Sequence, residues 1–360
     1  MYKEVLEFYK NKRVLITGHT GFKGCWLSKV LISAGAKVCG YSLEAPTTPN
    51  LFNLCNVHKE MESYIADIRD YEKLNKYISI LKPEIVFHLA AQPIVRESYK
   101  DPRNTYETNI MGTVNLLESV RSCDSVQSVI NITTDKVYHN KEWCWGYREN
   151  EELDGFDPYS NSKSCSELVT SGYRNSFFMD RSVAISTARA GNVIGGGDFA
   201  KDRVLPDCLR AITNKDIMVV RNPNSIRPYQ HVLEAIFAYM IIAEKQYNEP
   251  SLSGAYNVGP DSSDCWSTGK LVDQFCQKWN NISGDNLRWE HRQMYEEHEA
   301  NFLKLDNSKI KSVLGWKPNW SLERALEKVV EWDKAFVFGD SIDVCMNAQI
   351  VEYFGIQNLG

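Results

Sequence analysis

The chain has 360 residues, of which 43% are hydrophobic and 24% are charged, with only 21 glycines and 12 prolines. This composition excludes a disordered or low-complexity protein, and the length suits two domains or one large α/β domain with an added part. The formal net charge of -5 argues against a protein that mainly neutralises nucleic-acid phosphates. An anionic ligand would therefore need a local group of basic side chains.

The cysteines and the apolar runs indicate the compartment. Ten cysteines are scattered without a CxxC pair, so neither a metal site nor a redox dithiol is expected. Reduced thiols suit a reducing compartment. The first residues, MYKEVLEFYKNKR, are unlike a targeting peptide, and the longest apolar run, 235–243, is far shorter than a membrane span. We expect a cytoplasmic protein with neither a membrane nor nucleic acid as partner.

Short β-branched runs alternate with amphipathic stretches through the first half of the chain. Nearly continuous Val and Ile content in such strands indicates a parallel sheet that helices cover on both faces. The sequence therefore predicts a doubly wound α/β fold. In chain order, the predicted segments are a strand at 13–17, a helix near 23–34, strands at 37–42 and 84–88, a helix near 105–122, a strand at 126–133, a helix near 160–178 and a strand at 182–188.

Beyond about residue 190 the pattern changes to loops rich in Gly, Asp, Asn and Pro around shorter helices. A strand-like piece is predicted at 255–259, and helices at 265–278 and 321–336. We interpret this part as a smaller carboxy-terminal lobe. The sheet domain is assigned residues 1–190 and 229–259, and the lobe is assigned 191–228 and 260–360. Because ligands of open α/β sheets bind at the carboxyl ends of the strands, the cleft between the lobes is the expected site.

A glycine-rich turn, Gly18-His19-Thr20-Gly21-Phe22-Lys23-Gly24, lies between the first predicted strand and the first predicted helix. Glycines there permit a tight turn and close approach to a pyrophosphate, and the helix amino terminus offers oriented N–H donors. The position after the first strand of a βαβ unit favours dinucleotide binding over a purely structural turn.

The second strand lacks the acid that would bind the adenosine ribose, because it ends in Gly40-Tyr41-Ser42 with Glu44 beyond it. The turn has no Arg for a 2′-phosphate either, so the choice between NAD and NADP stays open at this position. Asp67 could accept a hydrogen bond from the adenine amino group, and an exposed loop aspartate is the alternative.

Tyr159 and Lys163 are four residues apart at a predicted helix start, so both side chains face the same space. A nearby cation favours the tyrosinate, which would lower the Tyr159 pKa toward the range of a general base. Upstream, Thr133, Thr134 and Asp135 end a predicted strand. Thr134 could relay a proton between a substrate hydroxyl and Tyr159, and Asp135 is a candidate acid, with a simple Ser/Thr turn as the alternative.

These motifs, in this order, resemble the extended short-chain dehydrogenase/reductase superfamily, whose members act on nucleotide-diphosphate sugars. Longer stretches are similar to the family of CDP-glucose 4,6-dehydratases, from about Lys12 to about Pro318. The stretches are GHTGFKG, FHLAAQPIVRESY, TNIMGTVNLLE, TTDKVYHNKEWCWGYREN, DPYSNSK, GGGDFAKDRVLPD and RNPNSIRPYQHVLE. The resemblance implies a Rossmann domain with NAD, a carboxy-terminal substrate-binding lobe, and a homodimer or homotetramer.

The resemblance also implies a reaction, the conversion of CDP-glucose to CDP-4-keto-6-deoxyglucose and water in deoxysugar and lipopolysaccharide biosynthesis. Tyr159, assisted by Thr134, would take the C4 hydroxyl proton while the C4 hydride passes to NAD. Loss of the C5 proton and of the C6 hydroxyl, protonated by Asp135, would precede return of the hydride to C6. Lys136 joins the catalytic group without a fixed role, because the related dTDP-glucose enzymes have Glu at this position.

The other site residues follow from the same motifs. Small side chains after His88 would admit the nicotinamide ribose, and arginines would bind the substrate phosphates. The expected cofactor-binding residues are Gly18, Thr20, Gly21, Phe22, Lys23, Gly24, Asp67, Ile68, Leu89, Ala90, Ala91, Thr108, Thr133, Tyr159 and Lys163. The expected substrate-binding residues are Gln92, Arg96, Asn192, Arg203 and Arg227.

Several other functions are weighed against this one. A nucleotide-sugar 4-epimerase needs Tyr159 and Lys163 but no acid for C6, so Asp135 favours dehydration. A dehydratase for a GDP-, dTDP- or UDP-sugar stays open, as does a reductase that consumes NAD(P)H. A non-catalytic dinucleotide sensor is disfavoured because Thr134, Asp135, Tyr159 and Lys163 are all present.

Overall fold

The computed structural model describes residues 1–179, 183–292 and 302–356. Within them, seven parallel strands form one sheet in the order β11-β6-β5-β4-β1-β2-β3. This arrangement confirms the predicted doubly wound α/β fold. The chain order reverses between β1 and β4, which is where open sheets of this kind bind their ligands. The strands are β1 (Arg13–Thr17), β2 (Lys37–Ser42), β3 (Glu62–Ile65), β4 (Ile85–His88), β5 (Ser128–Ile132), β6 (Ala184–Ala190) and β11 (Ala255–Val258).

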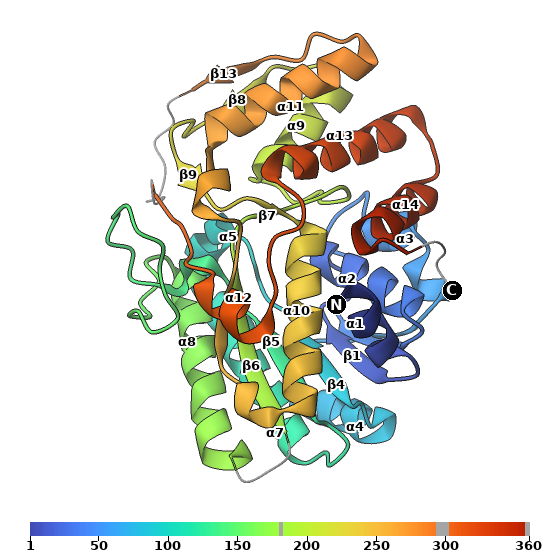
Figure 1. Ribbon diagram of the computed structural model, residues 1–360, viewed down its shortest axis with the longest axis vertical. Helices are drawn as coiled ribbons and strands as arrows, with labels where there is room; N and C mark the ends of the chain where they lie inside the picture. The colour runs from blue at the N-terminus through green and yellow to red at the C-terminus, as the bar shows by residue number, and fades with distance from the viewer. Residues whose placement is uncertain (180–182, 293–301, 357–360) are drawn as a thin grey trace.

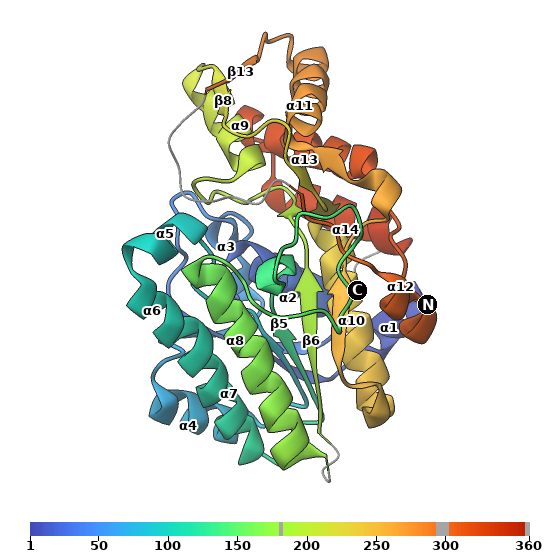
Figure 2. The ribbon, with the colours of Figure 1, turned by 90° about the vertical axis from the view of Figure 1, so that its left-hand side faces the viewer.

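Helices cover both faces of the sheet (Figure 1). One face packs against α1 (Tyr2–Tyr9), α2 (Phe22–Ser33) and α10 (Val232–Asn248). Figure 2 shows the other face, where α4 (Tyr71–Leu81), α7 (Gly112–Arg121) and α8 (Pro158–Tyr173) lie together. Successive strand residues point to opposite faces, so Val14 and Ile16 join the first apolar cluster and Leu15 joins the second.

A long helical stretch runs along this second face. It begins with α5 (Val95–Lys100) and α6 (Pro102–Tyr106) and continues through the π-helical turn η2 (Glu107–Met111) into α7. The helix α8 likewise continues into the π-helical turn η4 (Arg174–Phe178). The helices predicted near 105–122 and 160–178 are therefore present, each with one wide turn.

A second group of elements has an apolar cluster of its own, built on α9 (Val204–Asn214), α11 (Thr268–Ser283) and α13 (Leu322–Phe338). Short strand pairs join it: β8 (Met218–Val220) with β13 (Trp289–His291), β9 (Ile226–Arg227) with β12 (Trp266–Ser267), and β7 (Val193–Ile194) with β10 (Gln230–His231). Figure 1 shows this group at one end of the sheet.

The remaining elements are short or lie at the chain ends. The helix α14 (Ile342–Phe354) belongs to the residues that we assign to the lobe, yet its apolar side chains join the cluster of the sheet domain. None of the described helices is long and apolar enough to cross a bilayer. The other segments are α3 (Leu51–Leu54), α12 (Ser308–Leu314), η1 (Val57–Lys59), η3 (Asp135–Val137), η5 (Pro250–Leu252) and η6 (Ser262–Asp264).

Candidate active site

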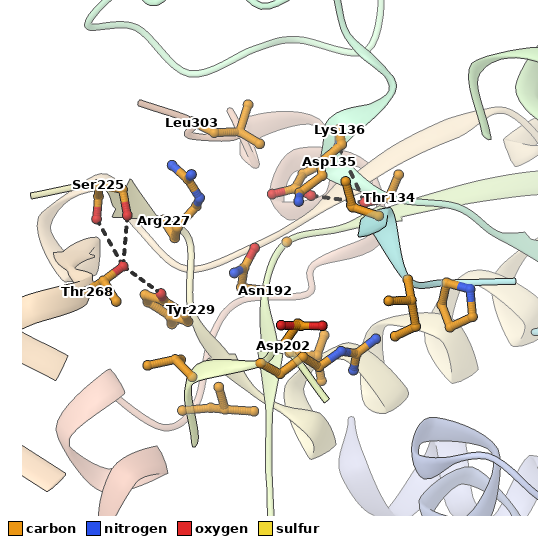
Figure 3. Close-up of a pocket in the computed structure, with 18 of the residues that line it drawn as sticks. Thr134, Asp135, Lys136, Asn192, Asp202, Ser225, Arg227, Tyr229, Thr268 and Leu303 are labelled. Carbon is orange, nitrogen blue, oxygen red and sulfur yellow. Dashed lines mark hydrogen bonds between the residues drawn. The ribbon is translucent and has the colours of Figure 1, made fainter. Parts of the chain in front are cut away.

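A cavity of about 340 Å³ lies between the carboxyl ends of β5 and β6 and the second group of elements (Figure 3). Residues from distant parts of the sequence meet there, so the fold brings together most of the predicted catalytic and substrate-binding side chains. The predicted residues that line it are Phe22, Lys23, Arg96, Thr133, Thr134, Asp135, Lys136, Tyr159, Asn192, Arg203 and Arg227.

The glycine-rich turn joins β1 to α2 beside this cavity. Gly18 has a φ of +79°, and a Cβ atom there would lie 2.7 Å from the backbone nitrogen of Ala90. A Cβ atom at Gly24 would lie 2.2 Å from the Gly18 carbonyl oxygen. Gly21 precedes α2, so no side chain caps the first amides of the helix. The turn is therefore closed on its protein side and leaves a helix amino terminus for a pyrophosphate, which fits a dinucleotide.

Other expected cofactor residues lie around this turn. Thr20 Oγ1 is 2.9 Å from Ser42 Oγ and donates to the Leu43 carbonyl, which ties the turn to the end of β2. Thr17 Oγ1 accepts a hydrogen bond from the backbone nitrogen of Ala90, between Leu89 and Ala91. Ile68 packs at Gly112, and Thr108 is half-buried in η2. The carboxylate of Asp67 pairs with Arg69 at 2.6 Å. In the predicted contact with adenine, it would therefore bind Arg69 and the adenine amino group together.

The end of β5 carries the candidate acid. Asp135 is 2% exposed, and burial raises the pKa of its carboxyl group, opposed by Lys136, a Thr134 hydrogen bond and Arg227. Thr134 Oγ1 donates to Asp135 Oδ1 over 3.0 Å, while Oδ2 has no hydrogen-bond partner among the described residues. A buried carboxyl group with a raised pKa in a cavity is suited to proton donation.

The helix α8 presents Tyr159 and Lys163. The Asp157 side chain caps this helix by accepting the backbone N–H of Ser160, so Tyr159 stands in the first turn. Lys163 lies behind the cavity lining, where its Nζ atom donates to the Ile132 carbonyl over 2.9 Å. Burial lowers the Lys163 pKa to about 8.

The expectation of a lowered pKa for Tyr159 is wrong for this structure. Burial raises the pKa of Tyr159 to about 12, against the opposing effects of a Thr134 hydrogen bond and the Arg203 charge. The physical reason is that removing the phenolate from water costs more than these two groups return. Lys163 donates to the β5 backbone instead of bonding the phenol.

Among the expected substrate-binding residues, the arginines line the cavity, whereas Gln92 does not. Arg203 pairs with Asp198 over 2.9 Å, and Arg96 pairs with Asp202 over 2.8 Å, both at the cavity wall. Gln92 differs from the other predicted substrate-binding residues, because its side-chain amide bonds Ile94 of its own loop and Thr105 of α6. It therefore holds the segment that leads into α5, the helix that carries Arg96.

Sequence reasoning missed several polar residues of the site. Asp202 accepts from Arg221 as well as from Arg96, and so bridges α5 and the second group. Thr268 Oγ1 lies 2.9 Å from Ser225 Oγ and 3.0 Å from Tyr229 Oη (Figure 3). The aspartates close to Arg203 in the sequence could have indicated ion pairs at this site. Nothing in the sequence indicates that Ser225 and Thr268 lie together. In the part of the chain that the structure describes, no group of His, Cys, Asp and Glu could hold a metal ion.

Comparison with known proteins supplies the family. The model of a family described as GDP-mannose 4,6 dehydratase matches residues 15–329. A CDP-glucose 4,6-dehydratase of Salmonella typhimurium is 49% identical over 352 residues, which cover 96% of this chain and 97% of that protein.

Solved structures show the same fold at lower identity. An epimerase of Methanothermobacter thermautotrophicus has a TM-score of 0.80 and 20% identity, covering 94% of this chain and 97% of its own. A UDP-glucose 4-epimerase of Thermus thermophilus, solved in complex with NAD, has a TM-score of 0.76 and 22% identity, covering 89% of this chain and 99% of its own. These structures share the doubly wound sheet described above.

Proposed function

This chain belongs to the family described as GDP-mannose 4,6 dehydratase, and on that premise we propose that it converts CDP-glucose to CDP-4-keto-6-deoxyglucose and water. The observation that carries the choice of substrate is the 49% identity, over almost the whole chain, to the Salmonella CDP-glucose 4,6-dehydratase. The cavity supports the chemistry, since it gathers Thr134, Asp135 and Tyr159 at the carboxyl end of the sheet.

We propose NAD as the resident cofactor, held by the turn from Gly18 to Gly24 at the amino terminus of α2. The uncapped start of α2 and the close approach of Gly18 to Ala90 fit a dinucleotide. When bound, the nicotinamide supplies a hydride acceptor for C4 and a hydride donor for C6, and it ends the cycle unchanged. The Lys163 ammonium and the residues after β4 would orient it.

The residues of the chain divide the proton transfers between them. Tyr159 would remove the proton of the C4 hydroxyl, with the Thr134 hydroxyl and the Arg203 charge stabilising the phenolate. Asp135 would protonate the C6 hydroxyl, because burial keeps its carboxyl group protonated to higher pH than usual. The resulting elimination forms water. Lys136 stands beside Asp135 in the same cavity, and in its unprotonated form its amine would take the C5 proton.

The position of Asp135 also argues against the alternative function, 4-epimerisation. Inversion at C4 requires removal and return of a hydride at one carbon and no acid at C6. A buried carboxyl group beside Thr134, with one oxygen unpaired among the described residues, would have no task in that reaction. The dehydration therefore accounts for more of the site.

The test is a substrate panel. The protein with NAD is incubated with CDP-, dTDP-, GDP- and UDP-linked sugars, and the alkali-induced absorbance of a 4-keto-6-deoxy product is followed. We expect product from CDP-glucose without net consumption of NAD. Product from another nucleotide alone would overturn the choice of CDP, and formation of CDP-galactose would identify an epimerase.

We further propose that the protein acts in the cytoplasm as a homodimer or homotetramer. All ten cysteines are free thiols, which suits a reducing compartment. Large apolar side chains are exposed on the helical face of η2, α8 and η4, at Met111, Leu168 and Phe177. This face supports self-association, and the mass of the particle in solution tests it.

A further inference from the structure

Glu167 lies one helical turn beyond Lys163 on α8, and two turns beyond Tyr159. Its side chain is 3% exposed. A carboxylate is buried to this extent only where partners compensate the loss of water. None of the proton transfers proposed above uses this residue, so its burial needs a separate explanation.

The carboxylate of Glu167 connects α8 to two strands. Thr133 at the end of β5 donates its hydroxyl to Oε1. Thr187 of β6 donates to Oε2 over 2.7 Å, and Arg189 of the same strand donates its Nη2 to Oε2 over 2.8 Å. Both oxygens are therefore satisfied by groups that fix the helix relative to the carboxyl ends of the sheet.

Lys163 and Glu167 hold two successive residues, the last residue of β5 and the one after it. Lys163 donates to the Ile132 carbonyl, and Glu167 accepts from the Thr133 hydroxyl. The next residue is Thr134, which bonds the candidate acid. A shift of α8 by a fraction of an ångström would thus move Tyr159 relative to Thr134.

Glu167 also acts on Lys163 through charge. Burial lowers the pKa of Lys163 to about 8, and the negative charge of Glu167 opposes this effect. Among the described residues, the other groups near Lys163 supply no second anion that compensates its charge. Burial lowers the pKa of Lys23 of α2 and of His88 of β4, and the Lys163 charge adds to both effects. Arg189 pairs with Glu167 itself, and burial raises the pKa values of Tyr159 and Asp135.

We propose that Glu167 is a positioning residue of the reaction, which holds the end of β5 in register with α8 and supplies the negative charge that balances Lys163. The inference rests on the proposed function, because it assigns Glu167 to the proton-transfer site of that reaction. Glu167 does not touch the cavity; it acts through Thr133 and Lys163.

The test replaces the charge and keeps the shape, with Glu167→Gln. Without the carboxylate, Lys163 loses its proton at lower pH, so the alkaline limb of kcat/KM with CDP-glucose should move down by about one pH unit. The matched control is Thr187→Val, which removes one hydrogen bond to Glu167 and keeps its charge. This control should leave the alkaline limb at the wild-type position, whatever its kcat.

Glu167→Gln leaves the buried Arg189 guanidinium without its ionic partner, which can prevent folding. The double variant Glu167→Gln/Arg189→Met removes both charges and should show the same direction of shift. A third variant, Glu167→Asp, keeps the charge and shortens the reach. It should keep the wild-type alkaline limb with kcat at least about tenfold lower, since roughly ångström-scale misplacement carries such losses.

A folded Glu167→Gln or double variant with the wild-type alkaline limb would overturn the proposal, as would a Glu167→Asp variant with wild-type kcat. The affinity for NAD, measured by calorimetry across the same pH range, separates this failure from failure of the proposed function. If the wild-type protein binds NAD but releases no product from CDP-glucose, the function is wrong. NAD binding then still tests Glu167, because the charge-removing variants should lose their affinity for NAD at a lower pH than the wild-type protein does as the pH is raised.

Discussion

Asp135 is buried without being fully paired, which is unusual for a carboxyl group that serves only the fold. Its Oδ1 atom accepts from Thr134, and its Oδ2 atom has no partner among the described residues. Such an arrangement costs stability unless the group is protonated or meets a ligand. The positive charges of Lys136 and Arg227 limit the rise of its pKa. Burial of Asp135 with one oxygen unpaired thus both costs folding stability and raises the carboxyl pKa, which is the property that suits it to the proposed role of acid.

The variant Asp135→Asn should separate dehydration from C4 oxidation. The amide has the same shape but cannot deliver a proton, so dehydration should fall by about 10²–10⁴-fold while absorbance of reduced nicotinamide appears with CDP-glucose. Since the amide is cheaper to bury than an ionised carboxylate, thermal stability should be unchanged or higher. Asp124→Asn, at an exposed loop position, is the control. Unimpaired dehydration in Asp135→Asn would remove Asp135 from the reaction.

At the scale of the element, the wide turn η2 places Asn109 between a strand end and a helix. Asn109 Oδ1 accepts the backbone N–H of Gln92 over 2.8 Å, and Nδ2 donates to the Gln92 carbonyl and to Ser162 Oγ. The Ser162 hydroxyl in turn donates to the Tyr159 carbonyl. One buried amide therefore connects the loop after β4 to the first turn of α8.

Asn109→Leu keeps the volume and removes these hydrogen bonds. It leaves the N–H and C=O of Gln92 without this partner at a half-buried position, so the free energy of unfolding should fall by about 2 kcal/mol. The kcat should fall as well, because Tyr159 loses support. Urea unfolding measures the first effect, with Asn150→Ala at an exposed position as the reference. A stability equal to that of the reference variant would show that the bridge contributes nothing.

The predictability of the elements follows from their surroundings. The strands β1, β4 and β5 are buried on both faces, so they have continuous apolar runs that a sequence reveals. β3 reads Glu-Ser-Tyr-Ile and lies at the sheet edge, largely exposed, so no such run marks it. The helix α10 is apolar on nearly all sides because it lies between the sheet and other helices. Its residues therefore lack helical periodicity, and the sequence shows only an apolar run at 235–243.

The site was predictable where chain order determines position. Thr134 and Asp135 follow a strand, and Tyr159 and Lys163 begin a helix, so topology alone brings them to one edge of the sheet. Glu167 was not predictable, because a glutamate in a helix usually faces solvent and its partners come from β5 and β6. The raised pKa of Tyr159 depends on the depth of burial, which a motif does not encode.

At the scale of the whole molecule, Glu234 joins distant parts of the chain. It stands in the first turn of α10 and accepts the backbone N–H groups of Asn319 and Trp320 and the hydroxyl of Tyr353 on α14. The ring of Tyr2 on α1 stacks on the ring of Phe237 on α10, with 4.3 Å between the ring centroids. The amino-terminal helix, the central helix α10 and the carboxy-terminal helix thus meet at one buried carboxyl group.

This junction should make stability depend on pH. Burial raises the pKa of Glu234 to about 7, against the opposing hydrogen bonds from Trp320, Asn319 and Tyr353. The folded state therefore binds more protons than the unfolded state between about pH 4.5 and 7, so this contribution is complete below that range and is lost as the pH rises through it. The total loss is about 3 kcal/mol, from a difference of roughly 2.5 pKa units.

Glu234→Gln removes the titration and keeps an acceptor for the backbone groups. The free energy of unfolding of the wild-type protein, relative to that of this variant, should therefore decline from pH 5 to pH 7 and level off above. Urea unfolding at pH 5, 6, 7 and 8 measures the difference, and Glu7→Gln, at an exposed position of α1, controls for the loss of a carboxyl group alone. A difference that stays constant across this range, or that grows with pH, would mean that Glu234 is already ionised when the three helices pack.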